Sequence, residues 1–401
     1  MFVSSQMILS ILGYAWGPLT PFLKNNMTLS ATQIGSISSI FYFMAALSAF
    51  PSGILVDRYG VKKGLIGWTG ISGIPLLFLG LFKPTFPVFF LMVAVSGLGY
   101  GMGNPACSKG LFIWFDNNLR GLVFGIKQSA VTVGAALSSI LLIYLARTVG
   151  PFHTLGIIAA VIVVMSIILL IYYTDPPQSQ YISNDMTVFK NERIFAIFDD
   201  LFSNKHFLYL SAVMALLGLV QGTVVSFLIL YMIEKLGYSF LEAGTLFTSV
   251  MISGAVGRIL WGYLSDRLFG ARRKPVLIII STLALLAVMA LAVWNVTLSK
   301  WLFMPVLIVL GLSTVGWNSV ALVLVTEISA ELKIGTSVGL IATISWVGVA
   351  SGPIIFGGLT DHFGYFYAWM SLAFFCFLTL IYCFLLPEAD NGTAKYNRQH
   401  A

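Results

Sequence analysis

Residues 53–64 read GILVDRYGVKKG, and a variant of this stretch, GYLSDRLFGARRK, occupies residues 262–274. The opening glycines, at positions 53 and 262, lie 209 positions apart, and the same offset carries Gly35 onto Gly244. Each stretch follows a long apolar run and closes with basic residues. The chain therefore contains two related halves with the same boundary between apolar and basic sequence.

The composition is that of a membrane protein. Of the 401 residues, 58% are hydrophobic and 9% are charged, whereas soluble domains carry roughly 25% charged residues. Apolar runs of helix length recur throughout, long enough to cross a hydrocarbon core of about 30 Å, and the sequence lacks the short alternating segments of a β-barrel. It predicts an all-α polytopic membrane protein. The twelve expected spans are residues 4–23, 33–56, 64–82, 86–108, 121–146, 153–173, 206–233, 240–264, 276–297, 301–326, 337–359 and 364–386.

A polar segment at 174–205 divides the spans into six and six. It begins with Asp-Pro-Pro and predicts a cytoplasmic linker between an N-terminal bundle, 1–173, and a C-terminal bundle, 206–386, which a cytoplasmic tail follows at 387–401. Near the end of the linker, residues 192–202 place their apolar side chains largely along one helical side. This pattern predicts a short amphipathic helix on the membrane surface or, alternatively, a packed linker helix.

Basic residues are unequally shared between the two sides of the expected membrane. With the connections assigned to alternate sides, fourteen Lys and Arg residues fall on the side of the termini and five on the opposite side. Cytoplasmic loops carry the excess of Lys and Arg, so both termini are expected in the cytoplasm, in a multi-pass protein of a bacterial inner membrane. This bias explains the net charge of +7, which does not indicate nucleic-acid binding.

A second offset supports the duplication. GIKQSAVTVG at 125–134 matches GLIATISWVG at 339–348, 214 positions later, and this offset carries Asn104 onto Asn318. Duplicated six-helix units are typical of secondary transporters, whose substrate site lies near the bilayer midplane between the repeats. The sequence therefore predicts a carrier with a central site to which both halves contribute.

The two stretches of the first repeat resemble the loop signature of the major facilitator superfamily, Gly-x-x-x-Asp-Arg-x-Gly-x-Lys/Arg-Lys/Arg, and the resemblance extends over essentially the whole chain. It implies twelve transmembrane helices in two pseudo-symmetric six-helix bundles that alternate in access. The matching residues are Gly53, Asp57, Arg58, Gly60, Lys62 and Lys63 after the second span, and Gly262, Asp266, Arg267, Gly270, Arg272 and Arg273 after the eighth.

The same signature predicts a gate on the side of the termini. Glycine lets two helices approach closely, and an aspartate can meet a helix N-terminus, where the dipole favours negative charge. Such contacts would hold the gate in one state and break in the other; alternatively, the charges only orient the chain in the membrane. The expected gating residues are Gly53, Asp57, Arg58, Arg120, Gly262, Asp266, Arg267 and Glu327.

Two basic residues lie deep inside expected spans. Arg258 is eight residues before Asp266, about 12 Å from the helix end, and Lys127 in the other half lies at a similar depth, seven residues after Arg120. All fifteen acidic residues fall in loops or at helix ends, so no carboxylate is available at the midplane. A cation in the bilayer without a partner is costly. The expected partner is therefore an anionic substrate.

The eighth span has a second resemblance. Its pattern Gly-Arg-x-x-x-Gly-x-x-Ser-Asp, at residues 257–266, is similar to the oxalate/formate antiporter and monocarboxylate transporter families, in which an arginine at this point binds a substrate carboxylate. The resemblance implies the same role for Arg258, and bidentate guanidinium–carboxylate geometry suits it. The lysine that the oxalate carriers have in the eleventh helix is absent, which argues against oxalate. A structural Arg258, bonded to helix carbonyls, is the alternative.

Other polar and aromatic residues near the midplane complete the expected site. Gln128 follows Lys127, and Asn104 and Asn318 are repeat mates. Aromatic residues at this depth either line the cavity or pack against lipid and core. The expected substrate-binding residues are Arg258, Lys127, Gln128, Asn104, Asn318, Gln221, Tyr14, Tyr42, Trp317 and Trp346.

These features predict a secondary active transporter for a small organic anion, a mono- or dicarboxylate, that works as a symporter or an antiporter. The sequence contains no nucleotide loop, metal-ligand cluster or catalytic nucleophile, so no enzyme activity, cofactor or metal is expected. The expected partners are the anion, a co- or counter-transported ion and the lipid bilayer, with the chain acting as a monomer. Two alternatives stay open: the same fold carrying a neutral or zwitterionic solute, and a sensor derived from a transporter.

Overall fold

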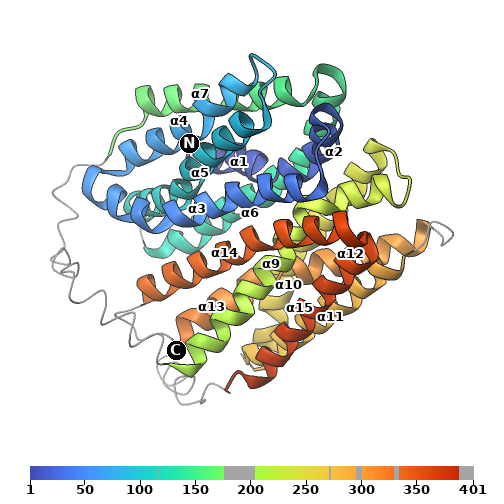
Figure 1. The fold of residues 1–401 in the computed structure, drawn as a ribbon. Coiled ribbons are helices and arrows are strands. Elements are labelled where there is room, and N and C mark those ends of the chain that lie inside the picture. Colours follow the sequence, from blue (N-terminus) through green and yellow to red (C-terminus); the bar gives the residue numbers. More distant parts are fainter. Residues whose placement is uncertain (116, 176–203, 271, 295–299, 329–333, 388–401) are drawn as a thin grey trace.

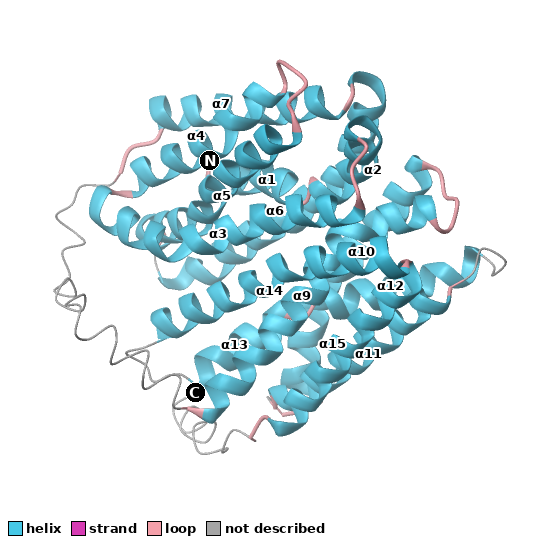
Figure 2. Cartoon of the chain, viewed as in Figure 1, coloured by secondary structure: helices cyan, strands magenta, loops and turns pink. Residues whose placement is uncertain are grey.

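The computed structural model describes residues 1–401 except 116, 176–203, 271, 295–299, 329–333 and 388–401, so the predicted linker helix and most of the tail lie outside the described residues. Within the described part, every regular element is an α-helix (Figure 2). The helices of the first half are α1 (Phe2–Gly13), α2 (Trp16–Met27), α3 (Ala31–Tyr59), α4 (Val61–Leu79), α5 (Phe86–Trp114), α6 (Asn117–Val149) and α7 (Pro151–Tyr172). Those of the second are α9 (Lys205–Glu234), α10 (Phe240–Arg267), α11 (Arg273–Val293), α12 (Lys300–Thr314), α13 (Asn318–Ile328), α14 (Ile334–Phe363) and α15 (Tyr365–Leu385).

The fourteen described helices make twelve spans, because two spans are broken. The helices α1 and α2 form the first span, interrupted at Tyr14 and Ala15, and α12 and α13 form the tenth, interrupted at 315–317. Ten spans meet the length and composition of a membrane-crossing helix; the other two are the broken first span and α4, whose first turn carries Lys62 and Lys63. The predicted fold class is confirmed. The sequence predicted the two broken spans as continuous.

Pro18 explains the first break. A proline ring clashes with the carbonyl group four residues earlier, here that of Tyr14, and the helix restarts at Trp16. Side chains satisfy the carbonyl groups at the break: the Tyr42 hydroxyl donates to the carbonyl oxygen of Gly13 at 2.7 Å, and the Ser138 hydroxyl donates to that of Tyr14 at 3.4 Å. The bilayer supplies no water for such groups, so the break depends on these partners from α3 and α6.

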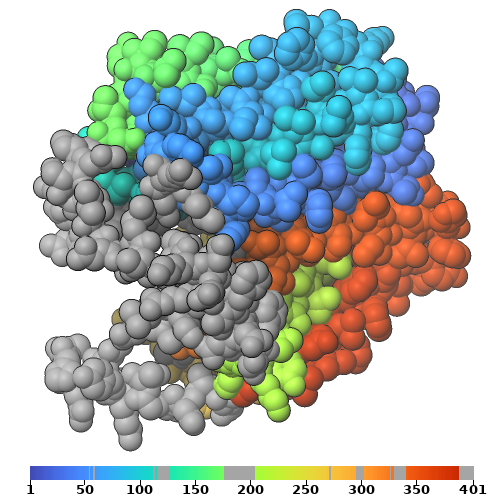
Figure 3. Space-filling view, turned by 60° about the vertical axis from the view of Figure 1, so that its left-hand side comes forward, coloured from blue at the N-terminus to red at the C-terminus, as the bar shows by residue number. Residues whose placement is uncertain are grey.

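The two halves lie side by side and meet most extensively along two helix pairs, α3 with α14 and α6 with α10, and α2 also packs against α9 (Figure 1). Figure 3 shows the first pair as a band where the blue half touches the orange one. A Cβ added at Gly35 would overlap the carbonyl oxygen of Pro353, and one added at Gly244 would lie 2.9 Å from that of Ser139. Two glycines that the sequence repeat relates therefore permit the close approach of each pair.

The polar contacts between the halves gather at one end of the helices. We call the end where α7 finishes and α9 begins the linker end, and the opposite end the far end. Lys24 and Glu234 form an ion pair of 2.7 Å at the far end, and Asp361 accepts hydrogen bonds from the backbone N–H groups of Ala31 and Thr32 at 2.8 and 2.7 Å. Among the residues described, every hydrogen bond and ion pair between the halves lies in the far-end part of its helices.

The linker end is open in this conformation. The helices of the two halves diverge toward it (Figure 1), and a Cβ added at Gly53 or Gly262 would meet no described atom within 4 Å. The close helix approach that the sequence suggested at these two glycines is therefore absent here, because the ends of α3 and α10 stand apart from the opposite half. It is found at Gly35 and Gly244 instead.

Candidate functional site

Lys127 is buried in the first half. The residue is 3% exposed, and its Nζ donates to Oδ1 of Asn104 at 2.5 Å and to Oγ of Ser108 at 2.8 Å. Lys127 lies on α6, whereas Asn104 and Ser108 lie one turn apart on α5. Two neutral oxygens of the neighbouring helix thus solvate the ammonium group, as a buried charge requires.

The α5 face that holds Lys127 also faces the second half. Tyr100 and Asn104 are four residues apart and share one side of the helix. The Tyr100 ring packs edge-on against Trp346 of α14, with ring centroids 5.8 Å apart. Asn104, one turn nearer the linker end, is exposed, whereas Lys127 behind it is not. Of these two predicted site residues, Asn104 is therefore the one presented between the halves.

In the second half, Gln221 brings two predicted residues together. Its Oε1 accepts hydrogen bonds from Nε1 of Trp317 at 3.1 Å and from Nδ2 of Asn318 at 3.3 Å. Gln221 lies in the middle of α9, and its two partners lie at the break of the tenth span. The three residues form one polar cluster, which ties the break to α9.

Arg258 reaches the same break from α10. Its Nε lies 3.5 Å from the carbonyl oxygen of Val315, a long hydrogen bond, and the Ser319 hydroxyl donates to the Arg258 carbonyl oxygen at 2.7 Å. Its Nη1 is buried and has no hydrogen-bond partner among the described residues. An unsatisfied buried N–H group is unfavourable. Arg258 thus combines one contact of a structural arginine with one unused donor.

Trp346 gives a common reference for the depth of the Lys127 cluster and the Gln221 cluster along the helices. Gly218 and Gly222, which flank Gln221 on α9, pack against the α14 backbone on either side of Trp346. Asn104 lies one helical turn, about 6 Å, beyond the α5 residue that touches the same indole. Gln221 therefore lies close to the level of Trp346, and Asn104 lies about one turn nearer the linker end than the residue that touches this indole.

Aromatic residues from both halves meet close to these polar groups. Tyr42 and Tyr100 of the first half each pack against Trp346, with ring centroids 5.8 Å apart. Tyr14, at the first break, is half-buried and packs on the same core. The predicted aromatic residues Tyr14, Tyr42 and Trp346 are thus neighbours of the predicted polar ones, with Trp346 contributed by the second half.

Four of the predicted residues have side chains that the structure does not describe. The side chains of Gln128, Asp57, Arg58 and Arg120 lie outside the described part of the structure. Their roles in binding and gating stay predictions.

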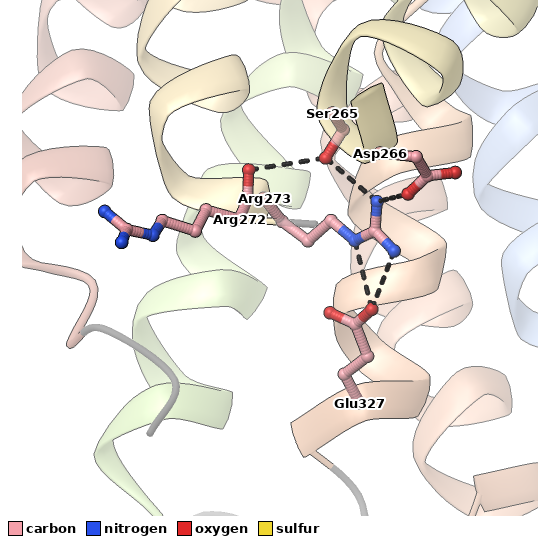
Figure 4. A network of polar contacts seen from close by, with 5 residues as sticks. All are labelled: Ser265, Asp266, Arg272, Arg273 and Glu327. Carbon is pink, nitrogen blue, oxygen red and sulfur yellow. Dashed lines mark hydrogen bonds and ion pairs between the residues drawn. The ribbon is translucent and has the colours of Figure 1, made fainter. Parts of the chain in front are cut away.

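At the linker end, Arg273 joins two predicted gating residues (Figure 4). Its guanidinium forms an ion pair with Asp266, and its Nε and Nη2 lie 3.0 and 2.9 Å from Oε1 of Glu327. Nη1 also donates to the Ser265 hydroxyl at 2.9 Å, while the Arg272 side chain points away. All these residues belong to the second half. In this conformation the network braces α10, α11 and α13 against one another.

Sequence reasoning did not place Tyr100, Ser108 or Arg273 in a site. Arg273 stood in the repeated motif, seven residues after Asp266, and that spacing was the available signal. Tyr100 and Ser108 precede and follow Asn104 by four residues, so helical periodicity would have found them. Their relation to Lys127 and Trp346 needed the packing of the helices.

Comparison with known proteins identifies the family. The profile of the Major Facilitator Superfamily matches residues 2–346. The chain is 25% identical to a probable hexose phosphate transport protein of Chlamydia trachomatis, over 95% of this chain and 88% of that protein. It is also 25% identical to the phosphoglycerate transporter protein of Salmonella typhimurium, over 95% and 85%. The membrane sensor protein UhpC of Escherichia coli is 25% identical over 88% of this chain and 83% of its own.

Solved structures agree on the fold. A bacterial homologue of the human lysosomal transporter Spinster, in an inward-facing and unoccupied conformation, matches with a TM-score of 0.81 at 16% identity, over 96% of this chain and 95% of that one. The nucleoside transporter NupG matches with a TM-score of 0.79 at 17% identity, over 96% and 100%. Together with the profile match, these likenesses indicate a transporter rather than an enzyme. The chain belongs to the Major Facilitator Superfamily of secondary transporters.

Proposed function

We propose that the protein moves a small organic anion across the membrane by alternating access, and that Arg258 contacts the anionic group. The observation that carries this proposal is Nη1 of Arg258, which is buried and lacks a hydrogen-bond partner among the described residues. A carboxylate or phosphate oxygen would supply the acceptor, because guanidinium groups bind both. The relatives named for hexose phosphate and phosphoglycerate support an anionic substrate.

Carboxylates and phosphate esters are both candidates for the anion. The sequence alone favoured a mono- or dicarboxylate, whereas the names of these relatives favour a phosphorylated compound. Phosphoglycerate contains both groups. A phosphate monoester carries about −1.5 to −2 charge at neutral pH, so the number of charges on the ligand is the variable to test.

In this proposal the linker end faces the cytoplasm of a bacterial inner membrane. The excess of Lys and Arg on the side of the termini supports this orientation, by the positive-inside rule. The conformation described is then open to the cytoplasm and closed to the outside by Lys24, Glu234 and Asp361. The substrate would enter or leave between the diverging helices of the linker end.

Ligand binding to the purified protein tests the role of Arg258. Losing a buried charged partner costs about 2–5 kcal/mol, so Arg258→Lys should weaken binding of the anion about 30-fold or more. The ammonium group cannot reproduce the planar fork. Arg147→Lys, at an exposed arginine near the far end of α6, is the matched control. Folded Arg258→Lys protein with wild-type affinity would make the arginine structural and favour a neutral or zwitterionic solute.

The likeness to a membrane sensor supports a second candidate function, that of a transporter-derived sensor. Uptake into proteoliposomes separates the two. A carrier accumulates or exchanges the anion that it binds, under a proton gradient or against internal anion, whereas a sensor binds without flux. Binding without uptake under all gradients would favour the sensor.

A further inference from the structure

The buried ammonium group of Lys127 fixes the orientation of an exposed amide. An ammonium group has only donors, so the Asn104 atom that lies 2.5 Å from Nζ must be the carbonyl oxygen. The N–H bonds of Asn104 are then directed away from Lys127. Because Asn104 is exposed, on the α5 face that touches Trp346, it presents these donors between the halves.

Gln221 is oriented in the same way in the second half. The indole N–H of Trp317 is also a donor only, so Oε1 of Gln221 must face it, at 3.1 Å. Nδ2 of Asn318 donates to the same oxygen at 3.3 Å. The Nε2 group of Gln221 is therefore turned away from both partners. Each half offers amide donors whose direction a second residue sets.

We infer that Asn104, rather than Lys127, is the substrate contact of the first half, with Gln221 as its counterpart, and that Lys127 is a positioning residue acting through Asn104. The inference rests on the proposed function for its ligand, since amide N–H donors suit ionised phosphate or carboxylate oxygens, which only accept. Lys127 is 3% exposed and bonded to Asn104 and Ser108. A ligand oxygen therefore meets the amide before the ammonium group.

This arrangement has a different charge dependence from a direct ion pair. A lysine in contact with the ligand favours a dianion over a monoanion, because the Coulomb attraction grows with ligand charge. A lysine that orients Asn104 is separated from the ligand by the amide group, so its attraction for either anion is weaker and the affinities for dianion and monoanion differ less. The ratio of the two affinities thus separates the roles.

Three ligands built on one pyranose ring provide the test: glucose 6-phosphate, glucuronate and glucose. In Lys127→Met, we expect the affinity for both anions to fall about tenfold or more, as for one hydrogen bond to a charged group, and the two losses to differ by no more than about tenfold. Asn104→Leu should do the same, and should cost little more when Lys127 is already replaced. Lys109→Met, at a neighbouring lysine whose Nζ donates to the carbonyl oxygen of Val56 at 3.2 Å, is the control and should keep wild-type affinity.

Two results would overturn the inference. One is a Lys127→Met variant that loses about a hundredfold more affinity for glucose 6-phosphate than for glucuronate, as expected for a direct ion pair. The other is a folded Asn104→Leu variant, checked by thermal melting, that binds as tightly as the wild type. If glucose alone binds, the proposed anion is wrong, and loss of glucose binding in Asn104→Leu still supports the contact.

Thiol labelling tests the same geometry without a ligand. Asn104→Cys should react with a small water-soluble thiol reagent, and Lys127→Cys should react about tenfold more slowly or less, because burial denies access. The native cysteines are buried and give little background: Cys107, Cys376 and Cys383. Equal rates at the two positions would overturn the inference. A slow Lys127→Cys with no binding of any of the three ligands would support the geometry and exclude these three compounds as substrates.

Discussion

Asp361 of α14 accepts two hydrogen bonds from Thr32 of α3, one from the backbone N–H at 2.7 Å and one from the hydroxyl at 2.6 Å. The two residues are 329 positions apart and belong to different halves. The carboxylate lies at the N-terminus of α3, which begins at Ala31, where the helix dipole favours negative charge. This contact stabilises the conformation that is closed at the far end.

Removing the carboxylate should loosen the far end. We expect Asp361→Ala to shift the balance toward conformations open at the far end by about 1–3 kcal/mol, the usual scale of such coupling. Distances between spin labels on the far ends of α3 and α14 measure the shift. Ser239→Ala is the matched control, because Ser239 caps α10 at the same end of the molecule through Glu242 of its own helix. Identical distance distributions in wild type and Asp361→Ala would contradict the prediction.

A methyl group at Gly35 should act in the same direction by a steric route. A Cβ there overlaps the carbonyl oxygen of Pro353, and overpacking of this kind costs about 1–3 kcal/mol. Gly53→Ala, on the same helix, meets no described atom within 4 Å and should leave this conformation undisturbed. The same pair of labels reports both variants. Equal effects of the two substitutions would show that the contact at Gly35 does not set the balance.

The residues of the network around Arg273 should contribute unequally to the free energy of unfolding. The Arg273 side chain is 11% exposed, whereas those of Asp266 and Glu327 are 61% and 37% exposed. Asp266→Ala should therefore cost only about 0.2–1 kcal/mol, as exposed pairs do, while Arg273→Ala, which releases three helices, should cost more. Thermal melts of the two variants and of Glu327→Gln give the ranking. A larger loss for Asp266→Ala than for Arg273→Ala would mean that Asp266 has another partner.

The orientation in the membrane can be tested with an impermeant thiol reagent on intact cells. Cysteines placed at Lys83 and Lys300 should react from outside, since both lie in connections on the side opposite to the termini. A cysteine at Lys63 should react only after the membrane is permeabilised. Reaction at Lys63 in intact cells, with protection of the other two positions, would reverse the orientation.

The fold was predictable because its signals are local in the sequence. Span length, charge bias and the repeated Asp-Arg stretch are properties of short segments, and they are enough for twelve spans in two halves. The breaks were not predicted. Pro18 marks the first one, yet Pro21 and Pro51 lie inside continuous helices. A proline alone therefore does not determine where a helix breaks. A break also needs side chains from other helices to satisfy the freed carbonyl groups.

The contacts among the candidate site residues were predictable only in part. Depth and polarity placed both Lys127 and Asn104 near the midplane, and the two are in contact. Counting residues along one helix cannot tell which side of it faces a cavity, so it could not predict that the Lys127 side chain is enclosed. The partner of Arg258 at the tenth-span break could not be predicted either, because the chain was expected to be continuous there.

Gly35 and Gly53 are eighteen residues apart on α3, and Gly244 and Gly262 have the same spacing on α10. Eighteen residues make five turns, so the two glycines of each helix point to the same side, about 27 Å apart. Each helix thus has a glycine suited to close packing near both of its ends, and only the far-end glycine of each contacts the opposite half in this structure. Tilting one half against the other would move the close contact from the far-end glycine of each helix to the linker-end glycine without repacking either half. Single substitutions at these four positions would then change the relative populations of the two conformations, while leaving the substrate site untouched.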